Sequence, residues 1–416
     1  MIKNTNSAGQ PIICQLLSFL PRDIVETSVK SFKSDRYYKT MTTYKQLVFI
    51  LYGIVSKSQS LNQLCKNIIF LDGKLSYLGI TDLPAKSTLS DANINRCSDV
   101  FGDIYQKLCL RYKDEISPKH YGLVKDEILT DQVKIIDSST ISLFVDIFKG
   151  AGRNSINGKK KGGIKIHAQA PLGGSVPDLV HLTEAASNDK NFLGQLNSQK
   201  GSIYVFDKGY VNYQKWYDWT EKGVFYVTRL NENANFIIVK NRTNHVSEYA
   251  DGGIISDQEI LLNHSDTGLK ARLIHYKDPE SGKLLKFISN MFDYDTSTIC
   301  QLYKYRWGIE VMFKRLKQNF ELSCFYSDSS EGIKTQIWIT LIANLIFTVI
   351  HKQCKEAEVF TILVSMAAMN LVSYISLIKI VTMEKLDANE RNLLIVQYYL
   401  FDSETGGVLN KSREPT

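Results

Sequence analysis

The hydrophobic and polar positions of the first 120 residues follow a helical period. Residues 44–56 are mostly apolar, and residues 61–71 repeat apolar side chains at helical spacing. Beyond Pro84 a further apolar stripe extends to Leu108, and Thr88 with Asp91 at its start makes an approximate capping box. The pattern predicts several short helices joined by tight turns.

Beyond residue 134 the pattern becomes that of strands. The segment KIIDSSTISL, residues 134–143, is rich in β-branched residues and carries Asp137. Further strands are expected at residues 164–170 and 176–183, followed by a crossover helix at 188–196. A short apolar strand at 202–206 then ends on Asp207 and a glycine turn. The expected order is therefore strand, strand, strand, helix, strand.

Short strands separated by Asn, Asp and Gly turns fill the chain up to about residue 290. They are expected at residues 225–230, 236–239, 254–262, 271–276 and 284–289. The first of them would complete the core sheet. The others predict a mostly β insertion, at about 230–290, ahead of a helix that contains Glu310.

The most apolar stretches lie near the C-terminus, at residues 335–350 and 359–383. The second is long enough to span a bilayer. However, polar residues such as Ser365, Asn370 and Lys379 interrupt it, and no basic flank adjoins it. We therefore favour a helical core that covers the sheet over a membrane span.

Composition narrows the class of protein only slightly. The 416 residues suffice for two or three domains, and 50 Lys and Arg against 43 Asp and Glu give a charge of +7, which permits a polyanionic partner. Seven scattered cysteines without a C-x-x-C pair indicate reduced thiols in a cytoplasmic protein. The apolar run at 11–20 has no cleavage site after it, so we expect no signal peptide.

Four polar residues in YKYRWGIEVMFKRLK, residues 303–317, share one helical face. Tyr303, Arg306, Glu310 and Lys317 fall within an arc of about 60° on an α-helix. A single Glu among cations is usually a solvated ion pair. The full quartet resembles the Y-(2)-R-(3)-E-(6)-K signature of DDE transposases of the insertion sequence 4 family, in which the Glu is the third catalytic carboxylate.

Asp137 and Asp207 are the candidates for the other two carboxylates. An Asp before Gly at a strand end is, taken alone, an ordinary turn residue. However, DKGY, residues 207–210, resembles the second-aspartate motif of the same family. The strand order also fits an α/β ribonuclease H-like catalytic core, in which the first and fourth strands lie side by side and their acids converge.

Three carboxylates on separate elements suit hard cations. Asp137, Asp207 and Glu310 are expected to be the catalytic residues and the ligands of Mg²⁺ or Mn²⁺. Two ions about 4 Å apart would support phosphoryl transfer on DNA. The resemblance implies that Tyr303, Arg306 and Lys317 grip DNA beside the cleaved end.

A basic, glycine-rich loop at residues 152–165 is a second candidate for DNA contact. Lys159, Lys160, Lys161 and Lys165 lie among its glycines, and they would either clamp the DNA backbone or simply be solvated. His167 follows on a strand. Since no second His lies at ligand spacing, we interpret it as structural.

The sequence thus predicts a transposase that binds the inverted repeats of its own element, cleaves DNA and joins the freed ends to target DNA, as a homodimer without membrane contact. The expected domains are a helical DNA-binding domain at 1–125, the catalytic domain at 126–350, and a helical region at 351–416 for dimerisation or core packing. The first domain resembles the N-terminal domain of one branch of the family, around QLLSFLP and STLSDANINR. A helical bundle without DNA contact, an inactive repressor and a nuclease that does not join ends stay open.

Overall fold

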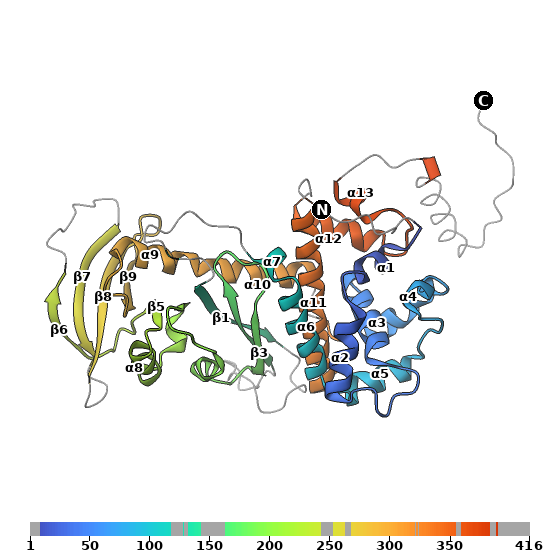
Figure 1. Ribbon diagram of the computed structural model, residues 1–416, viewed down its shortest axis with the longest axis horizontal. Coiled ribbons are helices and arrows are strands. Elements are labelled where there is room, and N and C mark those ends of the chain that lie inside the picture. Colours follow the sequence, from blue (N-terminus) through green and yellow to red (C-terminus); the bar gives the residue numbers. More distant parts are fainter. Residues whose placement is uncertain are drawn as a thin grey trace, which may run out of the picture. The chain divides into compact units, whose positions relative to one another are not determined.

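The computed structural model describes residues 9–117, 128, 132–142, 163–242, 253–262, 268–320, 322, 324–354, 359–382 and 388–389. The chain forms two compact units, shown in Figure 1. Unit 1 comprises Met1–Leu108 and Asn319–Thr416, and unit 2 comprises Cys109–Gln318. The three domains predicted from the sequence have other bounds and stay predictions.

Unit 1 is helical in its described residues, as the hydrophobic period predicts. Its helices are α1 (Ile12–Leu17), α2 (Arg22–Phe32), α3 (Thr43–Val55), α4 (Leu61–Ile68), α5 (Lys86–Asn95), α6 (Asp99–Arg111), α11 (Ser330–Gln353), α12 (Phe360–Met369) and α13 (Leu377–Thr382), and α7 (Lys113–Ile116) follows α6 in unit 2.

The helix expected from Thr88 onward is two helices, α5 and α6. They are separated because Arg96 has extended backbone angles. The N-cap of α5 is Ala85, whose side chain makes no capping hydrogen bond, so the predicted capping box of Thr88 and Asp91 is wrong. The apolar stripe continues across the break, which is why periodicity alone did not reveal it.

Helix α11 lies at the centre of unit 1. It packs against α3, α5 and α12, and its N-terminus is capped by Ser329, whose hydroxyl accepts a hydrogen bond from the Gly332 N–H at 3.0 Å. Its length and composition would allow a membrane span, but 94% of its most apolar 18-residue segment is buried within the protein. The other candidate stretch, 359–383, is divided between α12 and α13. Burial among helices therefore accounts for the first stretch, whereas in the second the buried residues of α12 and α13 alternate with more exposed ones such as Ile362 and Met369.

Unit 2 is built around one mixed sheet. Its strands are β1 (Val133–Ser142), β2 (Gly163–Pro171), β3 (Leu179–Glu184), β4 (Ile203–Phe206), β5 (Phe225–Arg229), β6 (Phe236–Asn241), β7 (Gly253–Leu262), β8 (Leu269–Lys277) and β9 (Leu284–Ser289). They are ordered β3-β2-β1-β4-β5-β9-β8-β7-β6. The predicted pairing of the first and fourth strands is confirmed, since β1 and β4 are parallel neighbours.

The crossover helix and the β insertion lie where the sequence predicts them, but the structure differs in the type of helix. The crossover between β3 and β4 contains a 3₁₀ helix, Asp189–Gln195, rather than an α-helix. The β insertion is present, and it extends the core sheet because β9 pairs with β5 while β8, β7 and β6 follow outward.

An aromatic cluster supports the strand that ends at Asp207. Helix α8 (Tyr213–Glu221) contributes Trp216 and Trp219, both fully buried. Trp219 stacks on Tyr204 of β4 and Trp216 stacks on Tyr226 of β5, each at 4.9 Å between ring centroids. These two tryptophans are therefore packing residues that fix the strands beside them.

The single helix expected to carry the polar quartet is interrupted. Helix α9 (Thr296–Tyr305) ends just before Arg306, and α10 (Trp307–Phe320) begins just after it. Arg306 keeps right-handed helical angles and its N–H bonds to the Tyr303 carbonyl, so the chain makes one tight turn and continues.

Candidate active site

Asp137 and Asp207 lie at equivalent points of two neighbouring strands. In the parallel pair of β1 and β4, Ile136 is the register partner of Phe206. The next residue along each chain segment is an aspartate, Asp137 within β1 and Asp207 just beyond the end of β4, so the two carboxylates lie side by side. This placement follows from the pairing of the first and fourth strands, which the sequence predicted.

The Arg306 guanidinium joins the first aspartate to Glu310. Its Nη1 donates to Oδ2 of Asp137 at 3.1 Å, and its Nη2 donates to Oε1 of Glu310 at 2.6 Å. The Arg306 side chain is only 12% exposed. One buried cation therefore lies between two of the three predicted catalytic acids.

Asp207 has two partners of its own. The Tyr303 hydroxyl donates to its Oδ1 at 3.3 Å, and Nη2 of Arg229 donates to the same oxygen at 2.8 Å. Arg229, the last residue of β5, was missed in the sequence. The strand-end argument that selects Asp207 would have found it, because β5 is parallel to β4 and Val205 pairs with Val227.

The two aspartates differ in their pKa. Burial, together with the smaller effect of the charges of Glu310 and Asp207, raises the pKa of Asp137 to about 6, although the Ser138 N–H and the Arg306 charge oppose the shift. Burial would also raise the pKa of Asp207, but hydrogen bonds from Arg229 and from the Lys208 backbone outweigh it, so that this pKa is lowered. Asp137 is therefore the acid that is more easily protonated, chiefly because it is buried.

Lys317 completes the quartet on the same side of α10. Its Nζ donates to the carbonyl oxygen of Thr140 on β1 at 3.2 Å. Tyr303, Arg306 and Lys317 therefore each contact β1 or the residue that follows β4, which agrees with the shared face predicted for them. The break at Arg306 does not separate them because its backbone stays helical.

A fourth carboxylate, Asp189, lies beside β1 and was also missed. Its Oδ1 accepts hydrogen bonds from the Ser138 hydroxyl at 3.0 Å and from Lys165 Nζ at 3.1 Å. Lys165 is buried in this ion pair, so its assignment to an exposed, solvated or DNA-clamping loop is wrong. Its β2 position opposite Thr140 turns it to the Asp189 side.

His167 is structural, as predicted. It is 1% exposed, stacks on Phe192 and shares a hydrogen bond of 2.9 Å with the Thr183 hydroxyl. Burial lowers its pKa to about 4. The three lysines of the predicted clamp, Lys159, Lys160 and Lys161, lie outside the described residues.

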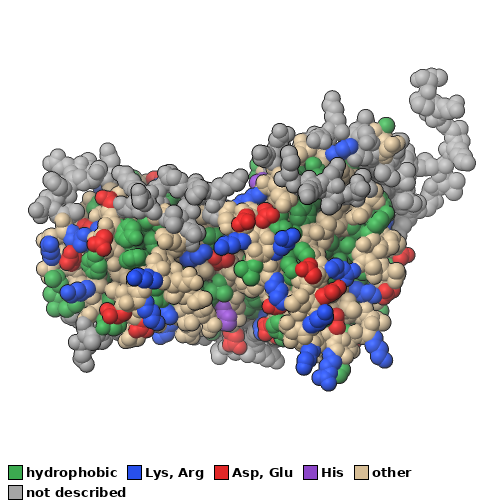
Figure 2. All heavy atoms as spheres, viewed as in Figure 1, with side chains coloured by type: hydrophobic (Ala, Val, Ile, Leu, Met, Phe, Trp, Pro, Cys, Tyr) green, Lys and Arg blue, Asp and Glu red, His purple; other side chains and the backbone are tan. Residues whose placement is uncertain are grey.

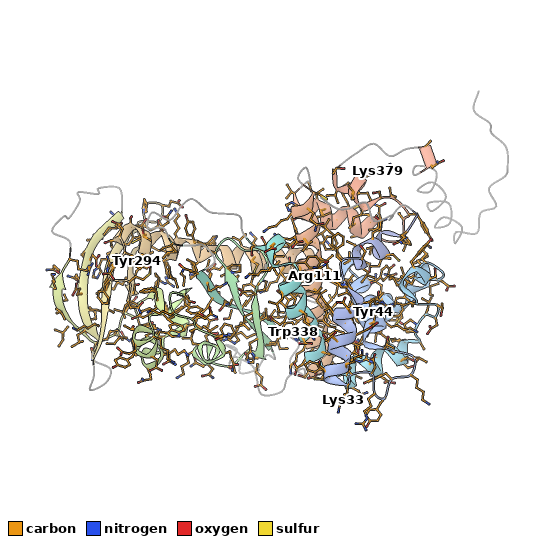
Figure 3. All side chains as sticks on the ribbon, in the orientation of Figure 1. Lys33, Tyr44, Arg111, Tyr294, Trp338 and Lys379 are labelled. Atoms are coloured by element: carbon orange, nitrogen blue, oxygen red, sulfur yellow. The ribbon has the colours of Figure 1, made fainter. Side chains whose placement is uncertain are left out.

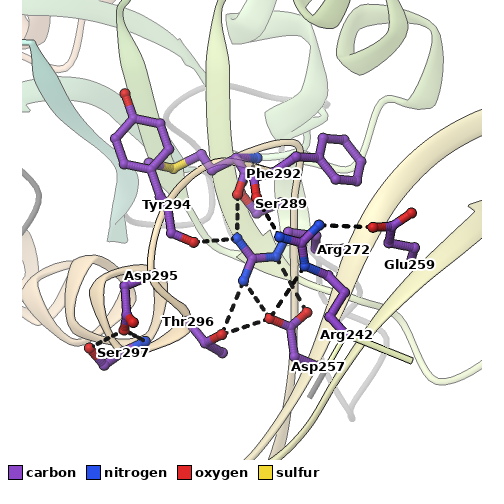
Figure 4. Close-up of polar contacts among 11 residues, drawn as sticks. Arg242, Asp257, Glu259, Arg272, Ser289, Phe292, Tyr294, Asp295, Thr296 and Ser297 are labelled. Atoms are coloured by element: carbon purple, nitrogen blue, oxygen red, sulfur yellow. Dashed lines mark hydrogen bonds and ion pairs between the residues drawn. The ribbon is translucent and has the colours of Figure 1, made fainter. Parts of the chain in front are cut away.

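A buried ion pair fixes the start of α9, the helix that leads to the site. Arg272 of β8 and Asp257 of β7 pair with side chains 2% and 1% exposed. Asp257 also accepts a hydrogen bond from the Thr296 hydroxyl at 2.7 Å, while Arg272 donates to the carbonyls of Met291 and Tyr294 (Figure 4). The insertion thereby holds the segment from which the quartet begins.

The three acids are of the right chemical type to bind a divalent cation, but they are not arranged around a common metal position in this structure. Carboxylate oxygens are the ligands that Mg²⁺ and Mn²⁺ prefer. Among the described residues, no group of three His, Cys, Asp or Glu is placed to hold a metal ion. Arg306 occupies the space between Asp137 and Glu310, so a metal held by both requires this guanidinium to move.

Comparisons with known proteins agree with these observations. The model of a family described as a transposase DDE domain matches residues 129–346, more than half of the chain, and a domain of unknown function matches residues 8–81. A putative transposase of Sinorhizobium fredii is 26% identical over 263 residues, which cover 62% of this chain and 70% of the relative. A putative transposase for the insertion sequence element IS4SA of Synechocystis is 25% identical over 328 residues, covering 78% and 86%.

A solved structure was also matched. It is a piggyBac transposase synaptic complex with hairpin DNA, 13% identical, with a TM-score of 0.45 over all of this chain and 88% of that one. A TM-score of this size assigns no fold.

Proposed function

Since the chain belongs to the DDE transposase family of the insertion-sequence type, we propose that it catalyses cut-and-paste transposition of an insertion sequence. It binds the terminal inverted repeats as a homodimer, cleaves the DNA by metal-dependent phosphodiester hydrolysis, and transfers the 3′ ends to target DNA. The observation that carries this proposal is the placement of Asp137, within β1, beside Asp207, which directly follows the parallel strand β4, with Glu310 joined to Asp137 through Arg306.

We propose that the core of unit 2 has a ribonuclease H-like fold. Support comes from the central strands, since β2 and β3 are antiparallel to their neighbours while β1, β4 and β5 are mutually parallel. In this arrangement the acid within β1 lies beside the acid that follows β4, and α9 with α10 brings the third acid to the same place.

Asp137, Asp207 and Glu310 are the residues that would hold Mg²⁺ or Mn²⁺, as a pair of ions. Such ions would supply the activation of a water for attack on phosphorus and the stabilisation of the departing 3′ oxygen, and with a 3′ hydroxyl in place of water the same chemistry would give strand transfer. The Asp137 carboxyl must be deprotonated to bind a cation. Arg306 assists by lowering its pKa against the effect of burial.

The cations around the acids then act on DNA. A guanidinium released from Asp137 and Glu310 presents a two-pronged donor to a phosphate, and Lys317 offers a point charge near β1. Tyr303 is positioned by its hydrogen bond to Asp207. Arg229 keeps Asp207 ionised by lowering its pKa. Each of these side chains thus either prepares a carboxylate or binds the backbone next to it.

The test is incubation of the full chain with a supercoiled plasmid that carries the DNA flanking its gene, with Mg²⁺ or with EDTA. We expect metal-dependent breaks at the repeat boundaries and joined products. Asp137→Ala, Asp207→Ala and Glu310→Ala should each abolish cutting, whereas binding to the repeats should persist because it depends on phosphate contacts elsewhere.

Three outcomes contradict the proposal in different ways. A variant that still cuts removes its residue from the site. Specific binding by the wild-type chain without breaks points to a repressor, and breaks without joined products point to a nuclease.

A further inference from the structure

The connection between α2 and α3 concentrates positive charge on the surface of unit 1. Its segment KSFKSDRYYK, residues 30–39, contains four cations whose side chains are all exposed: Lys30, Lys33, Arg36 and Lys39. None of the four forms an ion pair with another described residue. Figure 2 shows Lys and Arg side chains projecting from the end of unit 1 at which Figure 3 labels Lys33. We call residues 30–39 the α2–α3 surface.

The only acid of this surface is turned inward. Asp35 accepts hydrogen bonds from the N–H and the hydroxyl of Thr43, each at 2.7 Å, and from Arg96 at 3.3 Å. Its charge is therefore neutralised on the side facing the helices, and it does not offset the four exposed cations. The outward face of the surface is strongly positive for its length.

Exposed aromatic rings lie among the cations. Tyr37 is 82% exposed and Phe32 is 41% exposed. The Arg36 guanidinium lies 5.3 Å from the centre of the Tyr37 ring. An isolated run of lysines is usually only solvated, but here exposed rings lie beside the cations, so that the cations can meet phosphates while the rings add apolar contacts with the nucleotides.

The surface is held in shape by a buried arginine. Arg96, 1% exposed, donates to the carbonyls of Ser34 and Met41 at 3.3 and 2.6 Å, and it lies 4.0 Å from the centre of the Tyr38 ring. It is the last residue of STLSDANINR, a segment that the site in unit 2 does not explain. Preorganisation of this kind lowers the entropy lost when the exposed side chains bind a partner.

We propose that the α2–α3 surface is a DNA-binding surface, separate from the carboxylate site, in which Lys30, Lys33, Arg36 and Lys39 contact phosphates and Tyr37 packs against the nucleotides. The choice of DNA as the occupant rests on the proposed function. The inference assigns a ligand class to part of the region, residues 8–81, that matches a domain of unknown function.

The test measures binding of the full chain to fluorescent duplex DNA in EDTA, so that no cutting is needed, at several salt concentrations. Lys33→Gln with Arg36→Gln removes two charges from the surface. Lys66→Gln with Lys86→Gln is the matched control, because these two lysines are also exposed in unit 1, on α4 and α5.

We expect the surface variant to bind roughly tenfold to hundredfold more weakly near 0.1 M salt, with a log–log salt slope reduced by about 1.8, as for two lost phosphate contacts. The control should retain the wild-type slope. Tyr37→Ala should weaken binding without a change in slope, because the ring carries no charge and releases no counterion. Tyr77→Ala, at a tyrosine 57% exposed, should have no effect.

Equal losses in the surface variant and its control, or no loss in either, would overturn this inference and leave the proposed function standing. A wild-type chain that binds no DNA would overturn both. A measurement that needs no substitution is acylation of lysines with and without DNA. Protection of Lys30, Lys33 and Lys39 but not of Lys66 and Lys86 supports the surface, and the reverse pattern contradicts it.

Discussion

Replacement of Arg306 by Gln should tighten the binding of Mn²⁺ in the absence of DNA. The guanidinium is hydrogen-bonded to Asp137 and Glu310, and a metal ion held by both acids must displace it. Removing the internal competitor therefore favours the metal. Cutting should nevertheless fall in the variant, because the phosphate loses its two-pronged donor.

The size of the effect follows from the two contacts. A hydrogen bond between charged partners contributes about 1.5–3 kcal/mol, so two contacts give about 3 kcal/mol at the lower end. The Glu310 side chain is 34% exposed, and solvent screening weakens its contact. A total of about 2 kcal/mol corresponds to roughly thirtyfold in the dissociation constant.

The assay is titration calorimetry with Mn²⁺, first on the protein alone and then with DNA carrying the repeat. In the wild type, DNA should tighten Mn²⁺ binding because a phosphate takes over Arg306, and in the variant this coupling should shrink. Arg242→Gln is the control, since Arg242 pairs with Glu259 in the insertion. If Arg306→Gln bound Mn²⁺ no more tightly than the control, the competition would be refuted.

Three further predictions concern the framework and the DNA contacts. Arg272→Met should lower the free energy of unfolding of unit 2 by about 3–5 kcal/mol, because Asp257 is left buried and unpaired. The double variant with Asp257→Leu should recover part of this loss. Equal losses in the two variants, measured by urea unfolding, would count against this explanation. Burial lowers the pKa of His167 from 6.5 to about 4, so its contribution to stability is complete above pH 6.5 and is lost, by at most about 3 kcal/mol, as the pH falls to 4. His167→Gln should therefore reduce the dependence of the unfolding free energy on pH, measured by urea unfolding between pH 7 and 4.5. An unchanged pH dependence would show that another group causes it. Lys317→Ala should reduce the salt slope of DNA binding by about one, and a slope equal to that of the wild type would remove Lys317 from the phosphate contacts.

The sheet was predictable because local patterns repeat along it. Runs of apolar and β-branched residues marked β1, β2 and β4, and their order along the chain fitted a sheet in which the first and fourth strands are neighbours. The positions of Asp137 and Asp207 side by side followed directly. The link between Arg306 and Glu310 was equally predictable, since residues four apart on a helix are neighbours.

The remaining contacts depend on register and burial, which no local pattern encodes. Lys165 looked like part of a basic loop, but its place opposite Thr140 turns it toward Asp189. The role of Arg229 at Asp207 appears only once β5 is known to pair with β4. The break at Arg306 went unseen because a single tight turn barely changes which residues share a face.

The most direct test of the account asks whether Asp207 binds the metal. The substitution Asp207→Cys replaces an oxygen ligand by sulfur, which Mn²⁺ accepts more readily than the harder Mg²⁺. Cutting of repeat DNA by this variant should be absent with Mg²⁺ and partly restored with Mn²⁺, while Asp207→Ala should stay inactive with either ion. Equal activity of Asp207→Cys in both metals, or restoration of Asp207→Ala by Mn²⁺, would contradict the assignment of Asp207 as a metal ligand.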